Sequence, residues 1–168
     1  MYDELLQKVK TELYNKVKHY VLCSWYNYWT TVLIGDMISI HPAVVPTIKN
    51  VKGVDLFFDG QPFDLKITYL PSEYSDISAA MRNPKDLIVW FYENQRAQRF
   101  GANNRLFVVV HNSKNPDLSW QLKQEVKFLN SKIQEFFSSK KVFQDDKVVF
   151  NLGGNTYSAI AKILFVVK

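Results

Sequence analysis

The feature of the sequence that most constrains the fold is the dipeptide Asp59-Gly60, which separates two short apolar runs within residues 53–71. Asp-Gly readily adopts the positive φ values that a two-residue hairpin turn requires, and both runs are rich in residues typical of strands. With this dipeptide as the loop, Phe58 pairs with Gln61 and the two runs form an antiparallel hairpin. Because side chains alternate across a strand, the hairpin has two chemically different faces.

Ionisable residues interrupt both runs: Asp55 lies in the first, and Asp64 and Lys66 lie in the second. Asp64 and Lys66 share one face of their strand, and the register places Asp55 directly opposite Asp64, with Cβ atoms roughly 4.5–5.5 Å apart. Two opposed carboxylates repel each other, whereas together they suit a hard cation such as Mg²⁺. An acidic pair beside a lysine therefore indicates metal-assisted hydrolysis of a phosphodiester.

A simpler explanation for the same three residues is a solvated strand face with a weak surface ion pair. The neighbouring residues Phe57 and Phe58 favour a strand that is buried on both sides. Unpaired charge is costly in such a strand, so this context favours the metal-site hypothesis.

The sequence Val54-Asp55, followed after a short hairpin by Asp64-Leu65-Lys66, resembles the signature of the PD-(D/E)xK nuclease superfamily, which includes many type II restriction endonucleases. Val54 stands where the name-giving proline would be, and Asp64 replaces the commoner glutamate. The resemblance implies that Asp55 and Asp64 are catalytic ligands of Mg²⁺ or Mn²⁺. It also implies that Lys66 is catalytic and acts on the attacking water. Leu65 is included among the predicted metal ligands.

Residues 2–29 carry apolar side chains at the spacing of an amphipathic helix, and we expect one face of it to pack on the core. Glu12 lies at the margin of that face. The superfamily often places a glutamate from its first helix at the metal site, so the resemblance makes Glu12 the candidate third acid, both catalytic and metal-binding. A solvated helix charge is the alternative.

Basic and polar side chains on both sides of the hairpin are the predicted DNA contacts. Lys49 and Lys52 precede the hairpin, and Gln95, Arg96 and Arg99 follow it in an expected helix. The net charge of +5 agrees with an anionic partner, nucleic acid first, although it is a weak signal alone. A solvated surface explains the residues of the helix nearly as well.

Length and composition indicate one folded domain over residues 1–168. Apolar residues make up 47% of the chain, which excludes a disordered protein. Cys23 is the only cysteine, so a disulfide framework and a thiolate zinc site are excluded. No stretch resembles a signal peptide or a membrane span, and we expect a cytoplasmic protein that does not associate with membranes.

The rest of the chain predicts an α/β fold with a mixed central sheet flanked by helices. We expect a strand at Val32–Ile40 with Gly35-Asp36 as a turn, irregular structure from His41 to Pro46, and a helical stretch from Ser72–Asp76 to Arg99, interrupted near Asn83-Pro84. Further along we expect a buried strand at Arg105–His111 that follows a parallel crossover, a helix at Leu118–Phe137, and a tail that is a hairpin or a strand plus helix, with strands favoured. The resemblance implies a restriction-endonuclease-like core, α-β-β-β-α-β plus C-terminal additions.

These observations predict a Mg²⁺-dependent DNA endonuclease that acts on double-stranded DNA as a homodimer, with type II restriction as the expected role. A repair or recombination nuclease of the same fold remains an alternative. A nucleic-acid-binding or protein-interaction module that keeps the fold without cleaving DNA is another. Two further features have simpler structural explanations: the aromatic stretch Cys23–Thr31 is more typical of a core or an oligomer contact than of base stacking, and His41 is more typical of a structural residue than of a site residue.

Overall fold

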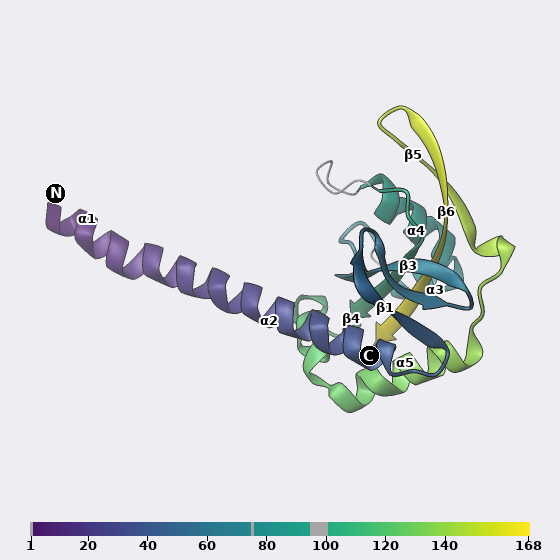
Figure 1. The fold of residues 1–168 in the computed structure, drawn as a ribbon. Coiled ribbons are helices and arrows are strands. Elements are labelled where there is room, and N and C mark those ends of the chain that lie inside the picture. The colour runs from purple at the N-terminus through teal and green to yellow at the C-terminus, as the bar shows by residue number, and fades with distance from the viewer. Residues whose placement is uncertain (1, 75, 95–100) are drawn as a thin grey trace. The chain divides into compact units, whose positions relative to one another are not determined.

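The computed structural model describes residues 2–74, 76–94 and 101–168, except for the side chains of residues 49 and 50. Its described part is an α/β structure with a six-stranded mixed sheet of order β1-β2-β3-β4-β6-β5 (Figure 1). The predicted α/β class, with a mixed sheet flanked by helices, is confirmed. The strands are β1 (Val44–Val51), β2 (Val54–Phe58), β3 (Gln61–Tyr69), β4 (Arg105–His111), β5 (Lys147–Leu152) and β6 (Asn155–Val167).

The chain divides into two compact units, Met1–Ile34 and Gly35–Lys168, and each is described on its own. Whether they make one domain, as the sequence indicates, stays a prediction. The first unit is helical. It contains α1 (Tyr2–Lys8), the π-helical turn η1 (Val9–Leu13) and most of α2 (Tyr14–Ser39), so the predicted helix is confirmed.

The predicted packing of one face of this helix on the core concerns a contact between the two units, so it stays a prediction. Apolar side chains along residues 2–29 are exposed, among them Trp25 at 62% and Trp29 at 52% of their full accessibility.

The predicted strand at Val32–Ile40, with its turn at Gly35-Asp36, is also wrong, because α2 continues to Ser39. Ile34, Met37 and Ile38 are buried, and this spacing of three to four residues is helical. Regular strand structure begins at Val44, earlier than the irregular stretch to Pro46 predicts. Pro46 is tolerated because β1 is an edge strand of the sheet.

The β2–β3 hairpin has the predicted turn and register. Asp59 and Gly60 have φ values of 52° and 75°, and Phe58 pairs with Gln61. The prediction that this strand is buried on both sides is wrong for β2. Leu56 and Phe58 are buried, but Phe57 on the opposite face is 38% exposed, so β2 is a half-buried strand.

A helical crossover connects β3 to β4 and makes the two strands parallel, as predicted. It contains α3 (Ile77–Arg82) and α4 (Pro84–Glu93). Asp76 begins α3 by accepting a hydrogen bond from Ser78 N at 2.8 Å, and the predicted interruption at Asn83-Pro84 is confirmed because Pro84 opens α4. Every residue of β4 is buried, which confirms that prediction.

After β4 the chain forms the 3₁₀ helix η3 (Pro116–Gln124) and α5 (Val126–Ser139), followed by the short turn η4 (Gln144–Asp146). The single helix predicted at Leu118–Phe137 is therefore wrong in its first third, where the chain is 3₁₀-helical and breaks at Glu125. The tail is a hairpin, as favoured, with a turn at Gly153-Gly154. Its second strand, β6, also runs parallel to β4 inside the sheet.

The strand registers define two faces of the sheet, because Cα partners on neighbouring strands point to the same side. On one face, Asp64 is in register with Arg105 and then Ala161, and Lys66 with Phe107 and Ile163. This face carries the core cluster that includes residues of α3 and α4, namely Ala80, Leu87, Ile88, Tyr92, Phe107, Val109, Val148, Phe150, Ala159, Ala161 and Ile163. The opposite face packs on α5, for example through Phe58 against Phe137, with ring centroids 4.9 Å apart.

Candidate active site

The side chains of Asp64 and Lys66 lie together on the α4 face of β3. Lys66 Nζ donates to Asp64 Oδ1 at 2.7 Å, which confirms that the two residues share a face. The Asp64 side chain is 12% exposed and the Lys66 side chain is 47% exposed. The carboxylate is therefore held in the sheet, while the ammonium group reaches towards solvent.

A second cation, which sequence reasoning missed, approaches the same carboxylate from β4. Arg105 Nε lies 3.4 Å from Asp64 Oδ2, and Arg105 Nη2 donates to the carbonyl of Gly101 at 3.2 Å. Arg105 is 5% exposed. The available signal was an arginine at the start of an otherwise apolar strand, because a buried arginine requires a nearby acceptor.

The ring of Tyr92, from α4, lies beneath Arg105, whose guanidinium carbon is 4.8 Å from the ring centroid. The Tyr92 hydroxyl donates to the carbonyl of Asn103 at 2.7 Å. Burial raises the pKa of Tyr92; nearby Arg105 lowers it and Asp64 raises it, both by less than burial does. Tyr92 thus remains a neutral donor that ties α4 to the segment before β4.

Asp55 projects from β2 towards the main chain of β3. Its Oδ2 accepts a hydrogen bond from the backbone N–H of Leu65 at 2.7 Å, and the side chain is exposed to solvent. The paired residues of the two strands include Leu56 with Phe63, and continuing that register sets Asp55 opposite Asp64. The Asp55 carboxylate therefore accepts the hydrogen bond from Leu65 that a backbone carbonyl of a paired strand would otherwise accept. Leu65 is itself a predicted metal ligand.

The remaining predicted site residues lie elsewhere or outside the described residues. Glu12 lies in η1 of the first unit and is exposed, so its role stays a prediction. Lys52 is exposed in the turn between β1 and β2. Lys49 lies in β1 but its side chain is outside the described residues, as are Gln95, Arg96 and Arg99 altogether.

His41 has a structural environment. It is buried, its Nδ1 accepts from Ala43 N at 3.1 Å, and its ring lies 5.4 Å from that of Phe137. These contacts fix the turn between α2 and β1. They agree with the structural role that we considered more typical of this histidine.

The hairpin offers two carboxylates as metal ligands. Within residues 2–74, 76–94 and 101–168, no three His, Cys, Asp or Glu side chains gather into a group that could hold a metal ion. Mg²⁺ commonly binds proteins through one or two carboxylates and keeps several waters, so the donor chemistry of Asp55 and Asp64 fits this ion. Arg105 and Lys66 are the groups that neutralise Asp64 in the structure.

Comparison of the chain with protein-family models, curated proteins and solved structures finds no match. Among the described residues, no helix is both long and apolar enough to cross a membrane.

Proposed function

We propose that this chain is a Mg²⁺-dependent DNA endonuclease with its active site at the β2–β3 hairpin. The observation that carries the proposal is the arrangement of three charged side chains. Asp55 and Asp64 lie on neighbouring strands, each one residue beyond the Leu56–Phe63 pair, and Lys66 Nζ lies 2.7 Å from Asp64 Oδ1. The resemblance of Val54-Asp55 and Asp64-Leu65-Lys66 to the PD-(D/E)xK signature supports the same assignment, and we propose that the sheet is a restriction-endonuclease-like core.

In this proposal Asp55 and Asp64 are the residues that would hold the metal ion, which supplies Lewis-acid activation of water and of the phosphate. Lys66 positions the attacking water and offsets negative charge on the phosphodiester, because its ammonium group reaches out beside Asp64. Arg105 remains beneath Asp64 and fixes the direction of its carboxylate. Lys52, exposed in the turn before β2, is a candidate contact to the DNA backbone.

A second candidate function is a non-catalytic nucleic-acid-binding or interaction module of the same fold. One observation favours it: contacts within the protein already engage both acids. Lys66 and Arg105 hold Asp64, and the Leu65 N–H binds Asp55. Such a network satisfies the charges of the hairpin without an ion.

Plasmid cleavage in the presence of Mg²⁺ separates the two candidates. We expect the wild-type chain to cut the plasmid, and Lys66→Met and the double variant Asp55→Asn with Asp64→Asn to lose at least about a hundredfold in rate. Lys85→Met and Asp117→Asn are matched controls outside the hairpin and should cut normally. DNA binding without cleavage under any divalent ion would favour the module, and normal cutting by the double variant would exclude the hairpin as the active site.

Mapping the ends of the cleaved DNA tests the biological role. We propose restriction by a homodimer in the cytoplasm, which requires discrete ends at symmetric sites. Scattered or structure-dependent ends would instead assign the chain to repair or recombination.

A further inference from the structure

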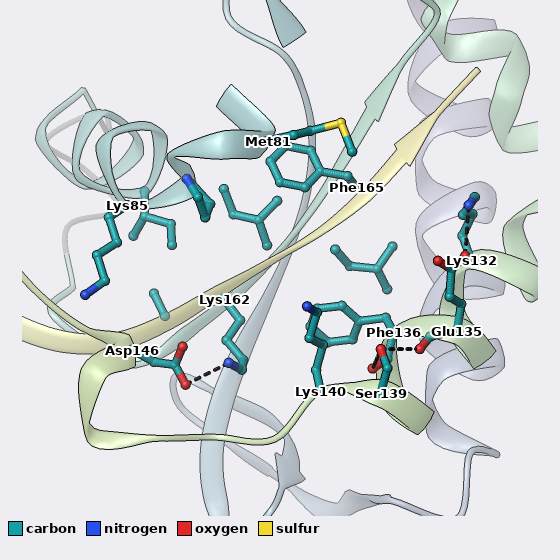
Figure 2. Close-up of a pocket in the computed structure, with 15 residues that line it drawn as sticks. Met81, Lys85, Lys132, Glu135, Phe136, Ser139, Lys140, Asp146, Lys162 and Phe165 are labelled. Atoms are coloured by element: carbon teal, nitrogen blue, oxygen red, sulfur yellow. Dashed lines mark hydrogen bonds and ion pairs between the residues drawn. The ribbon is translucent and has the colours of Figure 1, made fainter. Parts of the chain in front are cut away.

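A groove of about 410 Å³ lies along β6, and none of its lining residues belongs to β2 or β3 (Figure 2). Residues of α3 and α4 form one wall, and residues of α5 form the other. Asp146 of η4 lies at one end, and β6 residues from Ala161 to Phe165 form the floor. Apolar contacts come from both walls, including Met81 and Ile88 on one side and Phe136 on the other.

The floor of this groove is an open strand edge. β5 begins at Lys147, opposite Ile160, so it covers β6 only up to that residue. From Ala161 to Val167, β6 has β4 on one side, and the sheet order places no other strand beyond it in the described part of the chain. This edge spans about 13 Å between Ala161 and Phe165, at about 3.3 Å per residue.

Alternation of the backbone shows which groups face the groove. Ile160 N donates to Asn104 Oδ1, and Lys168 N donates to the carbonyl of His111, so even-numbered residues of this segment direct their backbone groups towards β4. The odd-numbered residues therefore direct theirs away from β4. Ala161 and Ile163 are 2% and 9% exposed because their side chains belong to the core cluster that includes residues of α3 and α4. Backbone N–H and C=O groups along a strand edge that no other strand covers favour a hydrogen-bonding occupant.

The charges around the groove select the occupant. Lys162 pairs with Asp146 at 2.7 Å, and Lys132 pairs with Glu135 at 2.8 Å. Lys85 and Lys140 also line the groove, and in the described part of the chain no ion pair engages either (Figure 2). The groove is therefore lined by two more cationic than anionic side chains, and the two lysines that form no ion pair among the described residues lie on opposite walls.

We propose that the groove binds an extended acidic peptide segment of a partner protein, which adds to β6 as a further strand in line with β5. Peptide binding of this kind uses main-chain hydrogen bonds for affinity and alternating side-chain pockets for specificity. The outward N–H and C=O groups of Ile163 and Phe165 supply the hydrogen bonds. Carboxylates of the peptide pair with Lys85 and Lys140, and apolar side chains contact Met81, Ile88 and Phe136.

The experiment uses the full chain and a labelled eight-residue peptide of alternating glutamate and valine as the probe. We expect saturable binding by fluorescence anisotropy. In amide hydrogen exchange resolved by NMR, the peptide should slow Ile163 and Phe165, whose N–H groups face the groove, and leave Leu164 and Val166 unchanged. Protection of all four amides alike, or of none, would overturn the proposal.

Two matched comparisons test the mode of binding. A peptide of the same sequence with N-methyl groups on the residues that face β6 should bind at least about tenfold more weakly, because it cannot donate to the edge. Lys140→Glu should weaken binding at least about fivefold, whereas Lys141→Glu, exposed but outside the groove, should not. Equal binding of the methylated peptide would exclude strand addition.

Other occupants give different results. Protection of Ile163 and Phe165 that rises with protein concentration, without peptide, would assign the edge to a second copy of the chain. Protection by a short DNA duplex but not by the peptide would assign it to nucleic acid. Either result overturns the proposal. Lys66→Met should leave peptide binding unchanged, so this test does not depend on the proposed nuclease activity.

Discussion

The β2–β3 and β5–β6 hairpins have the same construction, but they differ at the point where the shorter strand stops pairing with the longer one. In each, a short outer strand pairs with a longer inner one through a two-residue turn with positive φ, at Asp59-Gly60 and at Gly153-Gly154. Where β2 stops pairing, the Asp55 carboxylate accepts the next outward N–H of β3. Where β5 stops pairing, no side chain takes the same role for Ala161–Phe165 among the described residues, and the groove follows.

This difference shows that a charged side chain can replace a missing strand neighbour, and that the replacement changes what the edge is suited to do. At the β3 edge, Asp55 engages the first outward N–H beyond the paired residues, and the charge is concentrated at Asp55, Asp64 and Lys66. The β6 edge is open and its charge is distributed over the groove walls. The first arrangement suits chemistry at one point, and the second suits an extended partner.

The largest effect that we expect concerns the buried ion pair that supports the first hairpin. Asp64→Leu should lower the free energy of unfolding by about 3 kcal/mol, because it leaves buried Arg105 without its carboxylate. Asp64→Leu combined with Arg105→Met should cost about half as much or less, because both charges are then removed. Urea denaturation measures both.

Lys66→Met is the control for the variants of the Asp64–Arg105 ion pair. Its side chain is half exposed, so its removal should cost less than about 1 kcal/mol. Equal losses in the Asp64 single variant and the double variant would show that removing Arg105 recovers no stability, and that its uncompensated charge is not the cause of the loss.

A second prediction concerns Lys123, which is 3% exposed and lies with its Nζ 4.8 Å from the ring centroid of Tyr69, the last residue of β3. Burial lowers the pKa of Lys123 to about 8 in the folded chain, from 10.5 ordinarily. The unfolded chain therefore binds more protons between these values, and stability from this group should rise by about 2 kcal/mol from about pH 7 to about pH 9.5.

Urea denaturation across this pH range measures the effect. Lys123→Met should lack this part of the rise, and Lys127→Met, on exposed α5 surface, should keep it. Identical pH dependence of the wild-type chain and Lys123→Met would show that Lys123 keeps an ordinary pKa.

The third prediction separates the structural role of Asp55 from its proposed catalytic one. Asp55→Ala should cost about 1 kcal/mol of stability by leaving the Leu65 N–H without its acceptor, whereas Asp55→Asn keeps an acceptor oxygen and should cost less. Both variants should lose Mg²⁺-dependent cleavage. Cleavage retained by Asp55→Asn would limit Asp55 to its structural role of accepting the Leu65 N–H.

The last prediction tests how alike the two turns are. Gly60 and Gly154 have φ values of 75° and 81°, and a Cβ at either would meet no atom within 4 Å. Gly60→Ala and Gly154→Ala should therefore each cost about 1 kcal/mol, by backbone strain alone. Melting temperatures of the two variants measure this. A much larger loss for one of them would show that the hairpins differ in rigidity as well as in charge.

The parts of the fold that local sequence determines could be predicted. The turn at Asp59-Gly60 fixes the hairpin register, and the continuous apolar residues 106–110 fix a buried strand, because both signals lie within a few residues. Val32–Ile40 was misassigned because Gly35-Asp36 is typical of a turn. The burial of Ile34, Met37 and Ile38, which has a helical period, is visible only in the structure.

The candidate site could be predicted only where its contacts follow from neighbouring residues in the sequence. The contact between Asp64 and Lys66 follows from alternation along one strand, but the contact between Asp64 and Arg105 joins different strands and depends on the parallel register. The open edge of β6 depends on where β5 ends relative to its partner. Such relations between distant segments leave no local pattern, so the sequence could not indicate them.

The placement of the tryptophans in the two units has a spectroscopic consequence. Trp25 and Trp29 are exposed in the first unit. In the second unit Trp120 is also exposed, whereas Trp90 is half-buried and contacts the rings of Tyr74 and Phe91. Intrinsic fluorescence of the whole chain therefore sums emission from three exposed tryptophans and from one whose surroundings change more on unfolding. With Trp25→Phe and Trp29→Phe, the emission would report the sheet-bearing unit alone.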